Sequence, residues 1–196
     1  MEEAQIGTKA DMQPRLRLIK GGQHCELLMK AVRIVVAPED RPPFNVDAVA
    51  VEEDTFLVMS EAGQELPDTD EHPVRIMTRA IEVRPVSTGT VLVKRGHPLM
   101  FLAIVNDFDV EPSLREEWVA DAIYEIFRES ERRKIQSLAL PLIGTAHGLL
   151  SIERFLYLFH LILTKVLPIF PKQLWLIAPT GASSEIFRML EMKISN

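Results

Sequence analysis

The hydrophobic pattern of the chain is clearest in four short stretches in which most side chains are apolar. Such runs are typical of strands that are buried on both faces of a sheet. They lie at residues 46–51, 99–105, 137–140 and 174–177. Each of the last three is followed by a segment with helical character. This alternation predicts strands joined by right-handed crossovers, with helices on both faces of the sheet.

Three helices are predicted in this second half of the chain. The first begins at a capping-box pattern formed by Ser113 and Glu116, carries apolar pairs at every fourth position, and ends in the basic residues 132–134. The second, at 152–166, is apolar nearly all round, so it must pack on more than one side. The third is short and lies at 184–192.

The first half of the chain has weaker strand signals, which are separated by loops. These signals lie at 15–20, within 26–36 and within 74–93, where a turn is predicted at 87–89. Three prolines between residues 37 and 43 exclude a sheet interior there, so this segment is predicted to be a loop. A short helix is predicted at 56–62, inside a weakly patterned acidic segment.

Together these elements predict an α/β fold with three layers (α/β/α) around a central mixed sheet. Residues 1–13 show no periodicity and are predicted to form a flexible N-terminal arm. A length of 196 residues favours one domain, which we place at 14–196.

The composition narrows the class of protein further. Apolar residues (47%) suffice for a sizeable core, and a formal charge of −6 argues against a general nucleic-acid binder. The single cysteine, Cys25, excludes an internal disulfide and a Cys-based zinc site, and suits a reducing cytoplasm. The most apolar run, 155–170, is too short and too interrupted to cross a bilayer. We therefore expect a cytoplasmic protein with no membrane or nucleic-acid partner, no cofactor and no metal.

The best single clue to function is the segment 135–148, which combines a buried strand with a loop that contains glycines and leads into a helix. In that order, backbone N–H groups and a helix N-terminus can point at an anion. The sequence therefore predicts a phosphate-binding loop. Its candidate ligand-binding residues are Gly144, Thr145, Ala146, His147 and Gly148.

Three pieces of the chain, in this order of elements, resemble the macrodomain family. Residues 46–50 (Val-Asp-Ala-Val-Ala) are similar to the family's Val-Asp-Ala-Ile-Val strand, and residues 89–93 are similar to its Gly-x-x-x-x strand. Residues 137–151 are similar to the segment Ser-Ile-Ala-Phe-Pro-x-(Ile/Leu)-Gly-Thr-Gly, which carries the family's diphosphate loop. The similarity runs from about Val32 to Ile177. It implies a three-layer α/β/α fold and binding of ADP-ribose.

The resemblance also implies two acidic ligand-binding residues. Five residues separate Asp40 from Val46, and the family has an aspartate at this position that holds the adenine amino group. Asp54 matches an asparagine that positions the distal ribose in hydrolytic members. A solvated loop acid is the simpler interpretation of Asp40, because acidic side chains are usually exposed.

The chain departs from the family pattern in both halves of the diphosphate clamp. Val51 replaces an asparagine and cannot hydrogen-bond, and the glycine-rich loop is reduced to Gly63, beside Glu61 and Glu65. Ala146 stands where a glycine is usual, and alanine is strained there if the position requires a positive φ. The resemblance therefore implies a divergent member without hydrolase activity.

Two functions stay open from the sequence. One is weak binding of ADP-ribose or another nucleotide through residues 144–148, and the other is a structural or regulatory module that keeps the fold and binds a protein partner. An enzyme with new chemistry at His147, Asp107 or Asp109 is least supported. His147 has no evident partner for acid–base work, and the two aspartates are explained as turn and cap residues. No catalytic residue is assigned.

Overall fold

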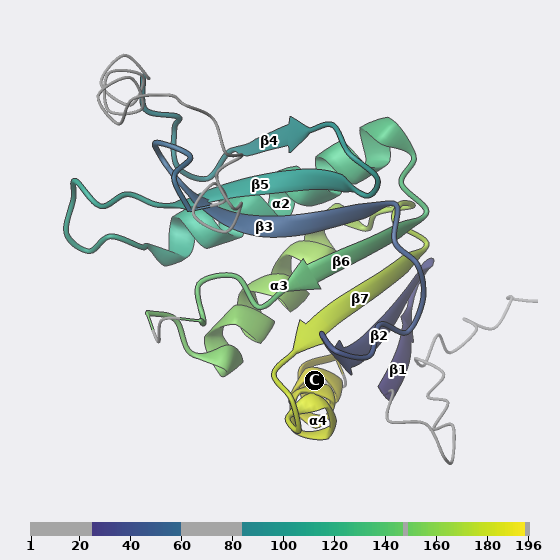
Figure 1. The fold of residues 1–196 in the computed structure, drawn as a ribbon. Helices are drawn as coiled ribbons and strands as arrows, with labels where there is room; N and C mark the ends of the chain where they lie inside the picture. Colours follow the sequence, from purple (N-terminus) through teal and green to yellow (C-terminus); the bar gives the residue numbers. More distant parts are fainter. Residues whose placement is uncertain (1–24, 60–83, 147–148, 195–196) are drawn as a thin grey trace, which may run out of the picture.

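A seven-stranded sheet forms the centre of the computed structural model, which describes residues 25–59, 84–146 and 149–194 (Figure 1). Its strands follow the order β1-β2-β7-β6-β3-β5-β4. They are β1 (Cys25–Met29), β2 (Val32–Pro38), β3 (Ala48–Asp54), β4 (Val91–Lys94), β5 (Leu99–Asn106), β6 (Ser137–Pro141) and β7 (Gln173–Ala178). The five middle strands are parallel, and β1 and β4 pair antiparallel at the two edges. The predicted central mixed sheet is confirmed.

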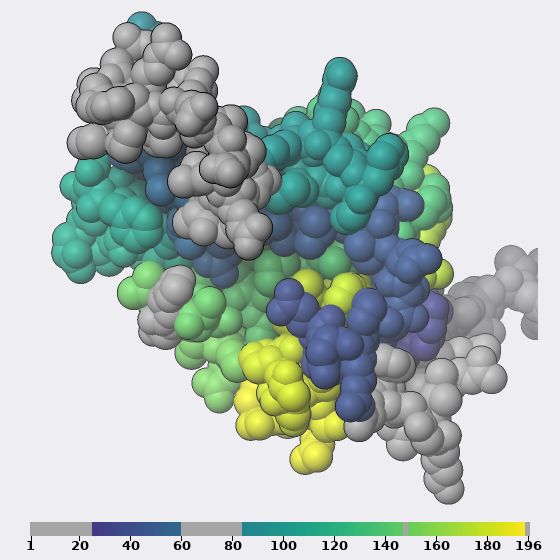
Figure 2. All heavy atoms as spheres, in the orientation of Figure 1, coloured from purple at the N-terminus to yellow at the C-terminus, as the bar shows by residue number. Residues whose placement is uncertain are grey.

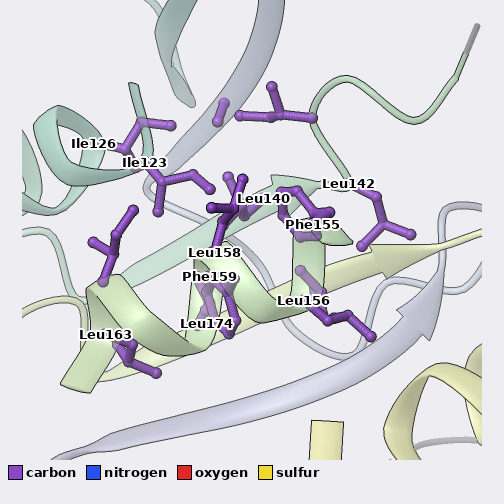
Figure 3. Close-up of a cluster of buried hydrophobic side chains, with 14 of the residues drawn as sticks. Ile123, Ile126, Leu140, Leu142, Phe155, Leu156, Leu158, Phe159, Leu163 and Leu174 are labelled. Carbon is purple, nitrogen blue, oxygen red and sulfur yellow. The ribbon is translucent and has the colours of Figure 1, made fainter. Parts of the chain in front are cut away.

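The main core lies between this sheet and the helices α2 (Glu116–Arg133), α3 (Ile152–Val166) and α4 (Ser183–Ile194). Side chains of α3 pack between Leu140 and Leu174 of the sheet and Ile123 of α2 (Figure 3). Phe155 and Phe159, one turn apart on α3, are both fully buried. Contacts with the sheet and with a helix on each side explain the buried apolar positions of α3, whereas Tyr157 and Leu161 on its outer side are 43% and 48% exposed.

The opposite face of the sheet carries a smaller apolar cluster around Trp175 of β7. The Trp175 indole Nε1–H donates a hydrogen bond of 3.0 Å to the carbonyl oxygen of Ala37, so the buried ring has its polar group satisfied. Ala139 completes the buried part of the cluster, and Phe44 and Val46 pack against it. This second face is only partly buried, since Val49 and Ile177 keep intermediate exposure. The three described helices all pack on the first face, so the helices predicted for the second face are not among the described residues.

The start of α2 differs from the prediction. Arg115 is the N-cap residue and makes no side-chain capping bond, so the predicted capping box of Ser113 and Glu116 is wrong. The backbone oxygen of Ser113 instead accepts the backbone N–H of Asp107 at 2.8 Å, which ties Ser113 to the end of β5 before the helix begins. At α3 the Ser151 hydroxyl does accept the backbone N–H of Arg154, at 3.2 Å, and the helix has the predicted bounds.

The first half of the chain holds a hairpin where one strand signal is visible in the sequence. β1 and β2 divide the segment 26–36, and Lys30 at their turn has φ 53°. The helix predicted at 56–62 is also wrong for its described part, since residues 55–59 form turns.

The predictions for 1–13, for 15–20 and for the first ten residues of 74–93 lie outside the described residues. The boundary of the single domain at residue 14 stays a prediction. No helix in the described ranges is long and apolar enough to cross a membrane.

Candidate functional site

The candidate site lies at the edge of the sheet where the parallel strands end. Because β2, β7, β6, β3 and β5 are parallel, their carboxyl ends meet at one edge, which is where ligands bind in open α/β sheets. The residues that follow these strands include Asp40 after β2, Thr180 after β7 and Gly144 after β6. Asp54 ends β3 at the same edge. The fold therefore brings Asp40, Asp54 and residues 144–146 of the predicted phosphate-binding loop to one side of the molecule. The strands β2, β3 and β6 that carry them can be followed in Figure 1.

Residues 142–146 follow β6 and form a tight turn, which we call the Gly144 loop. Gly144 has φ 82°, a backbone conformation that favours glycine, and a Cβ built there would make a tight contact of 3.1 Å with Leu114 Cδ1. The Thr145 hydroxyl donates to the carbonyl oxygen of Leu142 at 2.7 Å. The backbone oxygen of Gly144 accepts the N–H of Leu150 at 3.0 Å. In the same turn the N–H groups of Ile143 and Thr145 donate to the backbone oxygens of Pro141 and Leu142, and the N–H of Gly144 is one candidate anion donor.

That donor is already used within the protein. The backbone N–H of Gly144 donates a hydrogen bond of 2.8 Å to Oε1 of Glu52, a residue of the adjacent strand β3. A carboxylate oxygen thus lies where an oxygen of a bound phosphate would accept the same N–H. Hydrogen bonds from N–H groups to carboxylates are short and roughly twice as strong as neutral ones. Glu52 therefore occupies the anion position of the Gly144 loop.

Carboxylates at the end of β3 likewise accept hydrogen bonds from backbone N–H groups, here those of the turn that follows β3 itself. Oδ1 of Asp54 accepts the N–H of Phe56 at 2.7 Å, and Oδ2 accepts the N–H groups of Val58 and Met59 at 3.0 and 2.9 Å. Oε1 of Glu53 accepts the N–H of Met59 at 2.8 Å. Both carboxylates are buried, with exposed fractions of 0% for Glu53 and 2% for Asp54. These N–H groups follow β3, where the family resemblance places a glycine-rich phosphate loop.

An open hollow lies farther along the same edge, between the carboxyl ends of β2 and β7. It has a volume of about 330 Å³ and is lined by Pro38, Asp40, Arg41, Thr180, Gly181, Ser183 and Ser184; we call it the Asp40 hollow. The two contributing segments meet at the surface, in blue and yellow (Figure 2). The Asp40 side chain is 58% exposed, and its Oδ2 lies 3.9 Å from Nε of Arg41. Asp40 is thus accessible to a ligand.

The other predicted residues fall in different places. Ala146 is exposed and is not among the described residues with positive φ, so the condition under which alanine would be strained there is not met. The positive φ of the loop belongs to Gly144 instead. His147 and Gly148 lie outside the described residues. Asp107 Oδ1 accepts the backbone N–H of Asp109 at 3.0 Å, which fits the predicted turn role of these aspartates.

Sequence reasoning missed Glu52 as a residue of the site. The run Val51-Glu-Glu-Asp54 stood out as a departure from the family pattern. The signal that could have identified Glu52 is the alternation of side chains along the strand, which separates residues 51 and 53 from residues 52 and 54. β6 pairs in parallel with β3, so an acid near the end of β3 comes close to the turn that follows β6. The contact itself joins residues 92 positions apart, and local sequence patterns do not report such a distance.

No protein-family model and no curated protein sequence matches this chain. Solved structures do. The macrodomain of Oceanobacillus iheyensis with MES bound is 13% identical, covers 88% of this chain and 97% of its own, and superposes with a TM-score of 0.64. A mutant of the same macrodomain with ADPR is 10% identical over the same shares of the two chains, with a TM-score of 0.63.

Two further structures show the same arrangement. The macro domain of ganglioside induced differentiation associated protein 2 is 12% identical, covers 82% of this chain and 83% of its own, and has a TM-score of 0.59. The macrodomain of Thermus aquaticus DarG is 17% identical, covers 74% of this chain and 98% of its own, and has a TM-score of 0.52. The predicted resemblance is confirmed at the level of the fold: this chain has the three-layer α/β/α macrodomain fold.

Proposed function

We propose that this protein binds an adenine nucleoside or nucleotide weakly in the Asp40 hollow and does not hydrolyse ADP-ribosyl bonds. The observation that carries the proposal is the position of the hollow at the carboxyl ends of two adjacent parallel strands, with an exposed carboxylate on its wall. Such a carboxylate can accept a hydrogen bond from an exocyclic amino group. Asp40 also stands at the position that the family resemblance assigns to the adenine contact.

The fold supports the nucleotide class of ligand. Structures of the Oceanobacillus iheyensis macrodomain contain ADP and ADPR, so a nucleotide is the natural ligand to test on this scaffold. The sequence placed the binding at residues 144–148. The bond between Glu52 and Gly144 moves our proposal along the same sheet edge to Asp40, because the loop N–H is already satisfied.

The proposed lack of hydrolysis rests on β3. Asp54 matches the position of an asparagine that positions the distal ribose in hydrolytic macrodomains, and here its carboxylate accepts three backbone N–H groups of its own turn. Val51 offers no hydrogen-bonding group to a ribose. Release of ADP-ribose from a mono-ADP-ribosylated protein should therefore stay at the level of a control without enzyme, and robust release would contradict the proposal.

Calorimetric titration with adenosine and ADP-ribose, at up to millimolar ligand, tests the binding. We expect weak binding that Asp40→Ala reduces at least tenfold, because the loss of a charge-assisted hydrogen bond costs about 1.5–3 kcal/mol. Asp109→Ala is the matched control, since it removes an exposed acid from the same sheet edge. The absence of binding by the unmodified protein, or equal losses in both variants, would contradict the proposal.

A module without a small-molecule ligand is the second candidate function. The bond between Glu52 and Gly144 favours it, because a loop N–H that already donates to a side chain of the protein needs no phosphate as its acceptor. In that case the fold serves as a scaffold for a protein partner, and neither adenosine nor ADP-ribose shifts the melting temperature at millimolar concentration. The titration above therefore separates the two candidates.

A further inference from the structure

The geometry points to Glu52 as a specificity-determining residue that makes this site select uncharged adenine nucleosides over their diphosphates. This inference deepens the proposed function and rests on nucleoside binding in the Asp40 hollow. The observation behind it is that the Glu52 carboxylate lies 2.8 Å from the N–H of Gly144, at the same sheet edge as the hollow.

The distance along the edge sets which part of a ligand meets Glu52. Asp40 follows β2 and Gly144 follows β6, with β7 between these two strands. Neighbouring strands are about 4.8 Å apart, so the two positions are separated by about 10 Å along the edge. A nucleoside held in the Asp40 hollow therefore directs any long substituent that runs along the edge toward the Gly144 loop and the Glu52 carboxylate.

Binding of a diphosphate at that point is weakened for two reasons. The Gly144 N–H, which its oxygens could otherwise accept, already donates to Glu52, and the β6 turn is held by the bonds of Thr145 and Leu150. Its negative charge would also lie beside the carboxylate of Glu52, two residues from the buried carboxylate of Asp54. One like charge at contact distance, partly screened at the surface, weakens binding by roughly fivefold to tenfold. An uncharged ligand meets neither cost.

Glu52 is well placed to hold this position. Its backbone lies inside the sheet, where Glu52 is the register partner of Ala103 on the neighbouring strand β5. The side chain is half-buried, and it starts from a central strand rather than from a loop. A side chain anchored on a rigid strand keeps its acceptor at the Gly144 N–H with little loss of entropy, so displacement by an anion is unfavourable.

The test compares adenosine and ADP-ribose, by calorimetry at one ionic strength, on the unmodified chain and on Glu52→Gln. On the unmodified chain we expect adenosine to bind at least as tightly as ADP-ribose. Glu52→Gln should tighten ADP-ribose roughly tenfold and change adenosine less than twofold, because only the charge is removed. Glu125→Gln is the control: it removes one negative charge from the middle of α2, where Glu125 pairs with Arg128 on the surface, and should change both affinities less than twofold.

A second variant keeps the test decisive if the side-chain amide introduced by Glu52→Gln still accepts the Gly144 N–H. Glu52→Ala removes both the charge and the acceptor, and it should tighten ADP-ribose at least as much as Glu52→Gln does. Far-UV circular dichroism and a cooperative thermal transition establish that each variant is folded.

The possible results distinguish the role of Glu52 from the binding of a nucleoside in the Asp40 hollow. Tighter binding of ADP-ribose than of adenosine by the unmodified chain, with no gain in either Glu52 variant, overturns the role of Glu52 and leaves the Asp40 hollow as a nucleotide site. Binding of ADP-ribose only after Glu52 is replaced supports the role of Glu52, and it contradicts the proposed function only if the unmodified chain also fails to bind adenosine. A lack of binding by all variants overturns both.

Discussion

The Gly144 loop and the Asp40 hollow lie at the same sheet edge, two strands apart, and differ in how their polar groups are satisfied. Each region contains a glycine with positive φ, Gly144 at 82° and Gly181 at 83°. Around Gly144 the space is filled by Leu114, Val119 and Leu150, and its N–H donates to Glu52. Around Gly181 a Cβ would meet nothing within 4 Å. One turn is built into the core, and the other borders open space.

The difference shows how a ligand-binding edge can be kept in shape without a ligand. Buried or half-buried N–H groups need acceptors, and a bound phosphate is one source of them. In this chain the acids at the end of β3 provide acceptors for the β6 turn and for the turn after β3 itself. Asp40, at the far end of the edge, is exposed, and no bond among the described residues links it to this network. The two regions should therefore respond differently to substitution.

The largest contrast is expected between Asp54→Ala and Asp40→Ala. Asp54 is 2% exposed and accepts three backbone N–H groups, so its removal leaves several donors without their acceptor. We expect the free energy of unfolding to fall by about 2–4 kcal/mol. Asp40→Ala should change it by less than about 0.5 kcal/mol, since the side chain is exposed.

Urea denaturation of both variants measures this contrast from the transition midpoint and the slope. An equal loss of stability in the two variants would show that the turn after β3 does not depend on Asp54.

A smaller contrast is expected between the two glycines. Gly144→Ala adds a methyl group 3.1 Å from Leu114 Cδ1 in a turn with positive φ, so backbone strain and crowding both destabilise it, by about 2 kcal/mol in total. Gly181→Ala meets strain alone and should cost about 1 kcal/mol. Thermal unfolding by calorimetry gives the two values, and a larger loss for Gly181→Ala would contradict the packing described for the Gly144 loop.

Much of the fold is predictable from the sequence because the central strands and the helices carry their own hydrophobic patterns. The strand at 137–140 and the helix at 152–166 are examples, since continuous burial of Leu138, Leu140, Phe155 and Phe159 requires apolar residues throughout. The hairpin at Lys30 was not predictable, because β1 and β2 together read as one apolar stretch with no glycine or proline at the turn. The start of α2 was mispredicted because the backbone oxygen of Ser113 accepts the N–H of Asp107 within the loop that joins β5 to α2, and the residue pattern at 113–116 does not report this bond.

The candidate site was predictable only in its outline. Glycine near position 144 and an acid at position 40 follow from residue type and spacing, and the fold brings both to one edge. Whether the Gly144 N–H is available to a ligand depends on Glu52, which lies on a strand and precedes Gly144 by 92 residues in the chain. Ala146 shows the same limit, because its backbone conformation depends on which residue of the turn takes the positive φ.

The contrast between the two regions is tested most directly by NMR, following the backbone amides of the unmodified protein during titration with ADP-ribose. We expect chemical shifts to change for Asp40, Arg41 and Gly181, which line the hollow, while the amide of Gly144 keeps its shift because it stays bonded to Glu52. A titration in which the Gly144 amide moves most, with Asp40 and Gly181 unchanged, would show that the loop takes the phosphate and would contradict the roles proposed for Glu52 and the Asp40 hollow.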